Sequence, residues 1–227
     1  MAVPTRHKSR PSAADRRRRG RPPGADPRHG ERREAILAGA CRAIFERGFP
    51  ATRIADVAAS AGVSTGTVHY YFETKDDVLF AALKWASNRL LARVEEDAQA
   101  SAAQRLAQLL AISVPVPGEN RDEYVLWTEL WLRVLHRPDL LPDCEAISRR
   151  WRERFFAIVR EGTERGEFAP VCDPDEVADR LVALVDGLGF ETVLGYRWTS
   201  PEHMHARLIA FASEQLRIPA AALAPGG

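Results

Sequence analysis

The sequence from residue 52 to residue 72 reads TRIADVAASAGVSTGTVHYYF. Its first part places three apolar side chains on one face of a short helix: Ile54, Val57 and Ala58. Gly62 follows, and glycine tolerates the left-handed backbone of a tight turn. Ser64 is a suitable N-cap for a second short helix that ends near Tyr71. Two short helices joined by a tight turn predict a helix-turn-helix, whose second helix lies in the major groove of DNA.

The second helix begins with the small polar residues that a DNA-reading helix needs at its N-terminal end: Thr65, Gly66 and Thr67. A glycine inside a helix costs about 1 kcal/mol relative to alanine, which is reasonable where the backbone approaches DNA closely. His69 and Tyr70 add polar tips, and Lys75 is placed for a phosphate. We expect Thr52 to cap the first helix, and double-stranded DNA to be a partner.

Residues 62–75, GVSTGTVHYYFETK, resemble the signature of TetR-type transcriptional regulators. The resemblance is specific over about residues 32–80. It implies an all-helical homodimer, in which three N-terminal helices bind operator DNA and a larger helical domain binds a small-molecule effector. By position it assigns DNA contacts to seven residues: Thr52, Thr65, Gly66, Thr67, His69, Tyr70 and Lys75. The family usually has tyrosine where this sequence has His69.

The spacing of apolar residues predicts an all-α chain. Further helices are expected from Thr74 past Val94 and over about 102–114, 120–136, 141–163, 174–195 and 200–216. We therefore expect four segments: a disordered arm (1–30), a three-helix DNA-binding domain (31–76), a helical-bundle domain for effector binding and dimerisation (77–218), and a flexible tail (219–227).

The composition argues against several other classes of protein. At 45% hydrophobic and 28% charged residues the chain is typical of a soluble protein. No apolar run approaches the roughly 18 residues of a membrane span, and no apolar segment typical of a secretory signal follows the basic N-terminus. The three cysteines lack a CxxC spacing, which argues against disulfides and zinc and fits the reducing cytoplasm. We expect no cofactor and no metal.

The N-terminal arm is strongly basic. Residues 1–30 hold nine Lys and Arg against two Asp, a net charge of +7, which leaves −6 for the rest of the chain. Four of the basic residues are consecutive: Arg16, Arg17, Arg18 and Arg19. This pattern indicates either contact with DNA or a solvated arm that aids solubility.

Aromatic and acidic residues mark the candidate effector site. Trp127 and Trp131 share one helical face, as do Trp151 and Phe155. Three acidic residues lie among apolar neighbours: Glu129, Asp186 and Glu191. One interpretation is plain core, with Glu129 paired to Arg133 one turn on. The other is a cavity for a cationic ligand, held by aromatic faces and charge, and an apolar ligand is an equal alternative.

The last two predicted helices are expected to form the dimer. Their apolar faces carry seven candidate residues: Leu181, Leu184, Val185, Leu188, Ile209, Phe211 and Leu216. Ala183, Gly187 and Gly189 would permit close approach of another helix. The family resemblance implies a four-helix bundle across a two-fold axis. The alternative is that these residues only close the core of one chain.

Two rival functions are weaker. A helical enzyme would need a catalytic motif, and the sequence has no nucleophile elbow, phosphate loop or HExxH motif. A non-specific architectural DNA binder would not need a large aromatic C-terminal domain. We expect a repressor, because a tight dimer over a promoter excludes polymerase.

Overall fold

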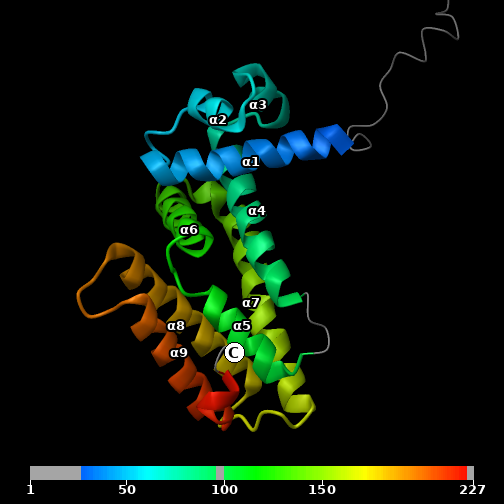
Figure 1. Cartoon of the computed structure of the whole chain (residues 1–227), viewed down its shortest axis with the longest axis vertical. Helices are drawn as coiled ribbons and strands as arrows, with labels where there is room; N and C mark the ends of the chain where they lie inside the picture. The colour runs from blue at the N-terminus through cyan, green and yellow to red at the C-terminus, as the bar shows by residue number, and fades with distance from the viewer. Residues whose placement is uncertain (1–26, 96–99, 224–227) are drawn as a thin grey trace, which may run out of the picture.

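The computed structural model describes residues 27–95 and 100–223, which form nine α-helices and no strand (Figure 1). The head consists of α1 (Pro27–Arg47), α2 (Ile54–Ala61) and α3 (Thr65–Tyr71). From the head, α4 (Lys75–Glu95) runs into a larger bundle of α5 (Ala102–Ile112), α6 (Glu119–His136), α7 (Leu141–Glu164), α8 (Pro174–Leu194) and α9 (Pro201–Leu216). Two 3-10 turns complete the chain, η2 (Pro138–Leu140) and η3 (Ala220–Leu223). The all-α prediction is confirmed.

Local signals set the ends of these helices. Gly62 closes α2 with a left-handed backbone, at φ 68° and ψ 31°, as the turn requires. The Ser64 hydroxyl caps α3 by accepting a hydrogen bond from the backbone N–H of Thr67 at 3.1 Å. Asp173 and Ser200 cap α8 and α9 in the same way. The predicted roles of Gly62 and Ser64 are confirmed.

Thr52 does not cap α2, and the prediction was wrong. The N-cap position belongs to Arg53, whose backbone N–H donates to the Asp56 carboxylate at 2.8 Å. Thr52 is only 2% exposed, and its hydroxyl lies 2.8 Å from the carbonyl oxygen of Gly48 and 3.1 Å from that of Ala43. It therefore ties the α1–α2 turn to the end of α1 and does not face DNA.

The crossing of α1 and α2 depends on Gly39. A Cβ at this position would lie 2.8 Å from the backbone nitrogen of Ala61 and 2.9 Å from its Cβ. We expect Gly39→Ala to lower the free energy of unfolding by roughly 1–3 kcal/mol, because a backbone atom must shift. Urea unfolding measures this effect. Gly30→Ala is the matched control, since Gly30 lies in the same helix with no atom within 4 Å.

If Gly39→Ala unfolded at the same urea concentration as the wild type, this close crossing of α1 and α2 would be refuted.

Three clusters of buried residues form the core. One lies inside the head, and the largest fills the C-terminal bundle. The third joins them, because Ile44 of α1 and Leu79 of α4 pack with Leu126 and Trp127 of α6. The head cluster also takes in Val78 and Ala82 of α4, beyond the domain boundary expected at residue 76. The two parts thus share a core at their junction.

Both ends of the described chain are more ordered than expected. The first helix begins at Pro27, four residues inside the segment assigned to the arm. At the other end, η3 lies in the expected tail, and its Leu223 is fully buried in the core of the bundle. Apolar burial of one leucine fixes this turn. Arg16, Arg17, Arg18 and Arg19 lie outside the described residues.

Candidate functional site

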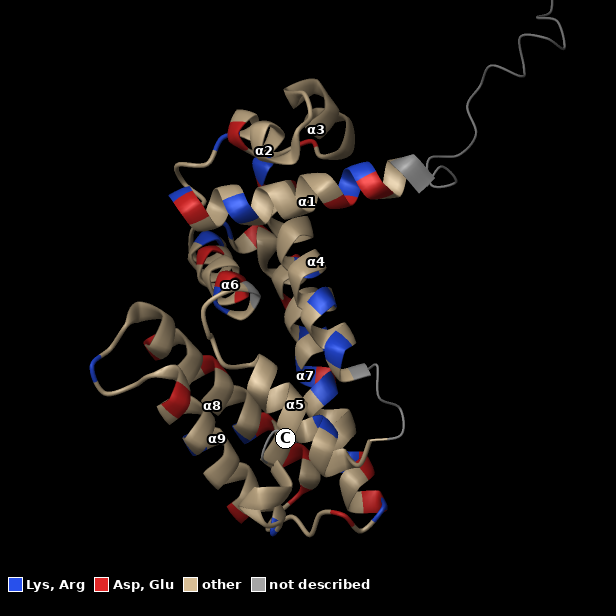
Figure 2. Ribbon diagram, in the orientation of Figure 1, with Lys and Arg blue, Asp and Glu red and all other residues tan. Residues whose placement is uncertain are grey.

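The outer surface of α3 carries most of the residues expected to contact DNA. Thr65, Gly66, His69 and Tyr70 are exposed there, and Thr67 is half-buried through its bond to Ser64. The structure thus brings five of the seven expected DNA contacts together on one helix. No lysine or arginine lies on α3, and the basic residues of the described head lie on α1 and the start of α2 (Figure 2). Phosphate contacts must therefore come from beside α3.

An aromatic cluster supports the end of α3. Tyr70 is 70% exposed, and its ring meets the rings of His29 and Tyr71 edge to face, at 5.9 Å and 5.2 Å. The Tyr71 hydroxyl lies 3.2 Å from Nδ1 of His29, which joins α3 to the first turn of α1. Tyr70 is therefore held in place while its outer surface stays free for DNA.

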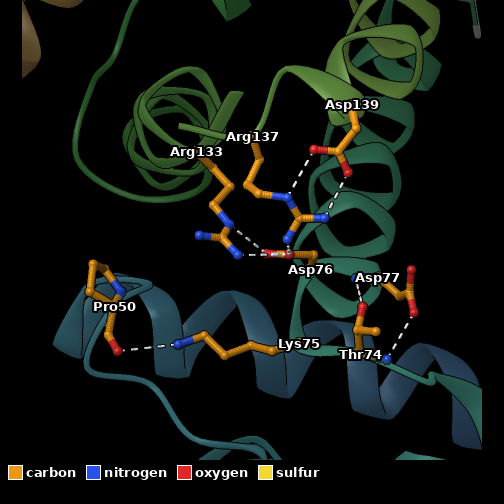
Figure 3. Close-up of polar contacts among 8 residues, drawn as sticks. All are labelled: Pro50, Thr74, Lys75, Asp76, Asp77, Arg133, Arg137 and Asp139. Atoms are coloured by element: carbon orange, nitrogen blue, oxygen red, sulfur yellow. Dashed lines mark hydrogen bonds and ion pairs between the residues drawn. The ribbon is translucent and has the colours of Figure 1, made fainter. Parts of the chain in front are cut away.

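Lys75 is engaged inside the protein. Its Nζ donates to the carbonyl oxygen of Pro50 at 3.2 Å (Figure 3). The same atom lies 4.3 Å from the centre of the Phe49 ring. Partial burial lowers the pKa of Lys75 from its usual 10.5. In this structure the ammonium ties α4 to the α1–α2 turn with one of its three N–H donors, which leaves two donors for a phosphate.

An ion-pair cluster joins the start of α4 to the end of α6. Arg133 donates two hydrogen bonds to the Asp76 carboxylate, at 2.8 Å and 2.9 Å (Figure 3). Arg137 lies 3.5 Å from the same carboxylate and also binds Asp139. A two-pronged arginine–carboxylate contact fixes orientation as well as distance. The cluster therefore holds the end of α6 against the start of α4.

Glu129 makes a second link from α6 to the head. Its carboxylate accepts a hydrogen bond from the backbone N–H of Phe49 at 2.9 Å. The expected pairing of Glu129 with Arg133 is wrong, because Glu129 binds Phe49 of the head and Arg133 binds Asp76 at the start of α4. We name the contacts of Glu129, Arg133 and Arg137 with Phe49 and Asp76 the hinge cluster.

A cavity of about 90 Å³ lies in the bundle among α5, α6, α7 and α8. Since one water needs roughly 10–15 Å³ by this measure, the space suits one small organic molecule. Four aromatic residues line it: Tyr124, Trp127, Trp131 and Trp151. Trp127 and Trp131 stack at a ring distance of 5.8 Å. Two carboxylates, Glu123 and Asp186, and the polar side chains of Ser148 and Arg152 also line it.

Glu123 is a buried carboxylate. It is 4% exposed, and its Oε1 accepts hydrogen bonds from the Ser87 hydroxyl of α4 and, at 3.3 Å, from Nε1 of Trp127. Burial raises the pKa of Glu123 to about 7, although both hydrogen bonds favour the charged form. Both hydrogen-bond partners of this buried carboxylate are thus uncharged groups.

Tyr124 stands between the two carboxylates. Its hydroxyl donates to the carbonyl oxygen of Val185 at 3.1 Å, and burial and the charges of Asp186 and Glu123 all raise its pKa. The pKa of Asp186 is raised to about 6 because neighbouring side chains displace water from its carboxyl, although the residue as a whole is exposed. Because Asp186 is exposed, water screens its charge, and Arg152 offsets part of it. Both carboxylates thus contribute negative potential at Tyr124.

Comparison with known proteins identifies the family of this chain. Residues 36–82 match the model "Bacterial regulatory proteins, tetR family", and residues 102–217 match "BetI-type transcriptional repressor, C-terminal". The chain belongs to the TetR family of transcriptional regulators. The expected family is confirmed, and members of the TetR family regulate transcription, so this chain is a transcriptional regulator and not an enzyme.

Individual relatives agree with the TetR assignment. The regulator BetI of Burkholderia mallei is 30% identical over 163 residues, 69% of this chain and 79% of BetI. The regulator PksA of Bacillus subtilis is 28% identical over 73% of this chain and 80% of PksA. A solved regulator from Saccharomonospora viridis, in complex with choline, is 34% identical with a TM-score of 0.71, over 82% of this chain and 98% of that one.

The predicted effector residues divide into two groups in this TetR-family chain. Trp127, Trp131, Trp151 and Asp186 line the cavity, and Phe155 lies fully buried behind Trp151 at a ring distance of 6.4 Å. Two acidic residues lie elsewhere. Glu129 belongs to the hinge cluster, and Glu191 accepts a hydrogen bond from Nε1 of Trp198 at 3.2 Å. Neither is in the lining of the cavity.

Four residues of the lining were not predicted from the sequence: Glu123, Tyr124, Ser148 and Arg152. Glu123 sits in the polar stretch ENRDEY, which is typical of an exposed helix start. The signal that could have found it is its spacing, because residues 123, 127 and 131 recur every four positions and share one face of α6.

The predicted dimer residues also fall into two groups, one buried and one partly exposed. Leu181, Val185, Leu188 and Leu216 are buried in the core of a single chain, so for these four the alternative interpretation holds. Leu184, Ile209 and Phe211 are partly exposed on α8 and α9. Gly189 makes room for Tyr124 of its own chain, where a Cβ would meet the ring, whereas no atom lies within 4 Å of a Cβ at Gly187.

No helix in the described part of the chain has the length and apolarity needed to cross a membrane.

Proposed function

We propose that this chain is a dimeric repressor that binds a palindromic operator and responds to a small organic cation with a quaternary ammonium group. The observation that carries the proposal is the cavity in which four aromatic residues surround a space bordered by Glu123 and Asp186. A quaternary ammonium has no N–H to donate, so aromatic faces and negative charge are what can recognise it.

An apolar effector fits the cavity less well. It would leave the Glu123 carboxylate buried without a counter-charge, and burying an unpaired charge is unfavourable. A cation over the Tyr124 ring would lie between the two carboxylates. The similar regulator from Saccharomonospora viridis was solved with choline, which supports the same class of effector for this chain.

The hinge cluster connects the helix that lines the effector cavity to the DNA-binding head. Tyr124, Trp127 and Trp131 lie on α6, the helix that also carries Glu129 and Arg133. A displacement of α6 by the effector would therefore pull on Phe49 and Asp76 at the base of the head. The effector shifts the population toward the state in which the two heads are wrongly spaced for the operator.

The exposed side of α8 and α9 is the proposed dimer face. Gly187 offers open space for a second helix, and Leu184, Ile209 and Phe211 add apolar surface beside it. Two-fold pairing of these helices would place two copies of α3 in successive major grooves, roughly 34–36 Å apart. The operator is then palindromic.

Choline tests the proposed effector class. We expect choline to raise the dissociation constant of the full chain for its DNA, selected from a random pool, by at least about tenfold. The neutral isostere 3,3-dimethylbutanol is the control, and it should leave DNA binding unchanged. Fluorescence anisotropy of labelled DNA gives both values. Equal effects of the two compounds would favour an apolar effector, and no binding of choline would refute the quaternary ammonium.

A further inference from the structure

The cavity also contains a positive charge. Arg152 lines it together with Glu123 and Asp186. Ser148 lies one helical turn before Arg152 on α7 and lines the same cavity. A guanidinium in the lining repels a bare organic cation, so Arg152 favours a ligand that also carries a negative charge.

The contacts of Arg152 leave it able to bind an anion. Its Nη2 donates to Asp179 on the rim, but the two side chains are 42% and 58% exposed, and such pairs are readily exchanged in water. The guanidinium lies 5.5 Å above the ring of Phe156, which holds it in position. An arginine carries five N–H donors in a fork that matches a carboxylate.

The cavity is therefore lined by groups of both charges. The carboxylates of Glu123 and Asp186 both act on Tyr124, and Arg152, which lies one turn from Ser148 on α7, also acts on the charge of Asp186. We infer that the effector is dipolar: a short betaine-type molecule whose quaternary ammonium lies against the aromatic residues and whose carboxylate binds Arg152 and Ser148. This inference rests on the proposed recognition of a quaternary ammonium and names the second half of the ligand.

A matched pair of ligands tests the inference. Glycine betaine and its carboxamide share the trimethylammonium group and the carbon skeleton, and differ in the negative charge. Titration calorimetry of the full chain should give glycine betaine a dissociation constant at least tenfold lower than that of the carboxamide. Arg152→Gln should bring the ratio to within twofold, and Arg152→Lys should keep part of it. Arg150→Gln, an exposed change on the same helix, should keep the whole ratio.

Thermal unfolding of each variant establishes that it is folded. Wild-type chain that binds the carboxamide or choline as tightly as glycine betaine would overturn the inference and leave the quaternary ammonium effector standing. Retention of the full ratio in folded Arg152→Gln would overturn the role of Arg152. Binding of none of the three compounds would overturn this inference and the proposed effector class together.

Discussion

Replacing Gly66 by leucine is expected to weaken operator binding at least a hundredfold while leaving the protein folded. Gly66 lies in the first turn of α3 and is exposed. The nearest atom to a Cβ built there is the Ser64 hydroxyl oxygen, at 3.8 Å, which is ordinary contact. The fold therefore does not require glycine at this position, and a larger residue should raise helix stability by up to about 1 kcal/mol.

The physical reason for the loss lies in the complex with DNA. The N-terminal turn of a reading helix enters the major groove, and only a glycine lets the backbone itself approach the bases. A leucine side chain in that space would hold α3 away from the bases. The contacts of Thr65 and His69 with the bases would then be weakened too. Gly66→Ala should show a smaller loss in the same direction, since one methyl group fills less of the gap.

Anisotropy titration with the selected DNA and thermal unfolding together check this prediction. Ala157→Leu, an exposed helical position on α7, is the control for adding an apolar side chain to the surface. It should change neither quantity appreciably. If Gly66→Leu bound DNA as the wild type does, the first turn of α3 would not be the part of the head that enters the groove.

The sequence predicts those features that depend on neighbouring residues. The left-handed Gly62, the caps at Ser64, Asp173 and Ser200, and the helix bounds all follow from signals within a few positions. Contacts between distant segments do not. Thr52 has the composition of a cap, but its hydroxyl lies against the carbonyl oxygens of Gly48 and Ala43, and only the fold brings Ala43 close.

The same limit explains the errors at the effector site. Glu129 and Arg133 stand one helical turn apart and so predict a pair, yet stronger partners come from Phe49 and Asp76, 80 and 57 positions away. Apolar periodicity in α8 correctly reports that Leu181 and Val185 are buried. Periodicity cannot say whether the covering surface belongs to the same chain or to a second one. The partner of a buried face is therefore a tertiary property.

Replacing Glu123 by glutamine is expected to weaken choline binding by about thirtyfold or more at pH 8. Loss of one partner of a buried charge pair typically costs 2–5 kcal/mol, and about 2 kcal/mol is thirtyfold. The amide oxygen of glutamine can still accept from Ser87 and Trp127, so the fold is kept. The control is Glu153→Gln, which removes an exposed carboxylate of α7.

The affinity of the chain for choline should also depend on pH. Choline keeps its charge at every pH, so only the protein titrates. The pKa of Glu123 is about 7 in the free chain, so below pH 7 the carboxyl carries a proton that choline must displace. Affinity should therefore rise with pH, by up to about tenfold per unit below 7, and level off above it.

Asp186 adds a second, weaker step to the pH dependence of choline affinity. Its pKa is about 6, and its exposure to water reduces the effect of its charge on the ligand. Glu123→Gln should remove the step near pH 7 and keep the shallow one near 6. Calorimetric titrations with choline between pH 5.5 and 8.5, in buffers of different ionisation enthalpy, give the affinity and the protons released. Affinity independent of pH in the wild type would mean that the cation does not meet Glu123, and the ammonium would then have to be placed by the aromatic rings and Asp186 alone.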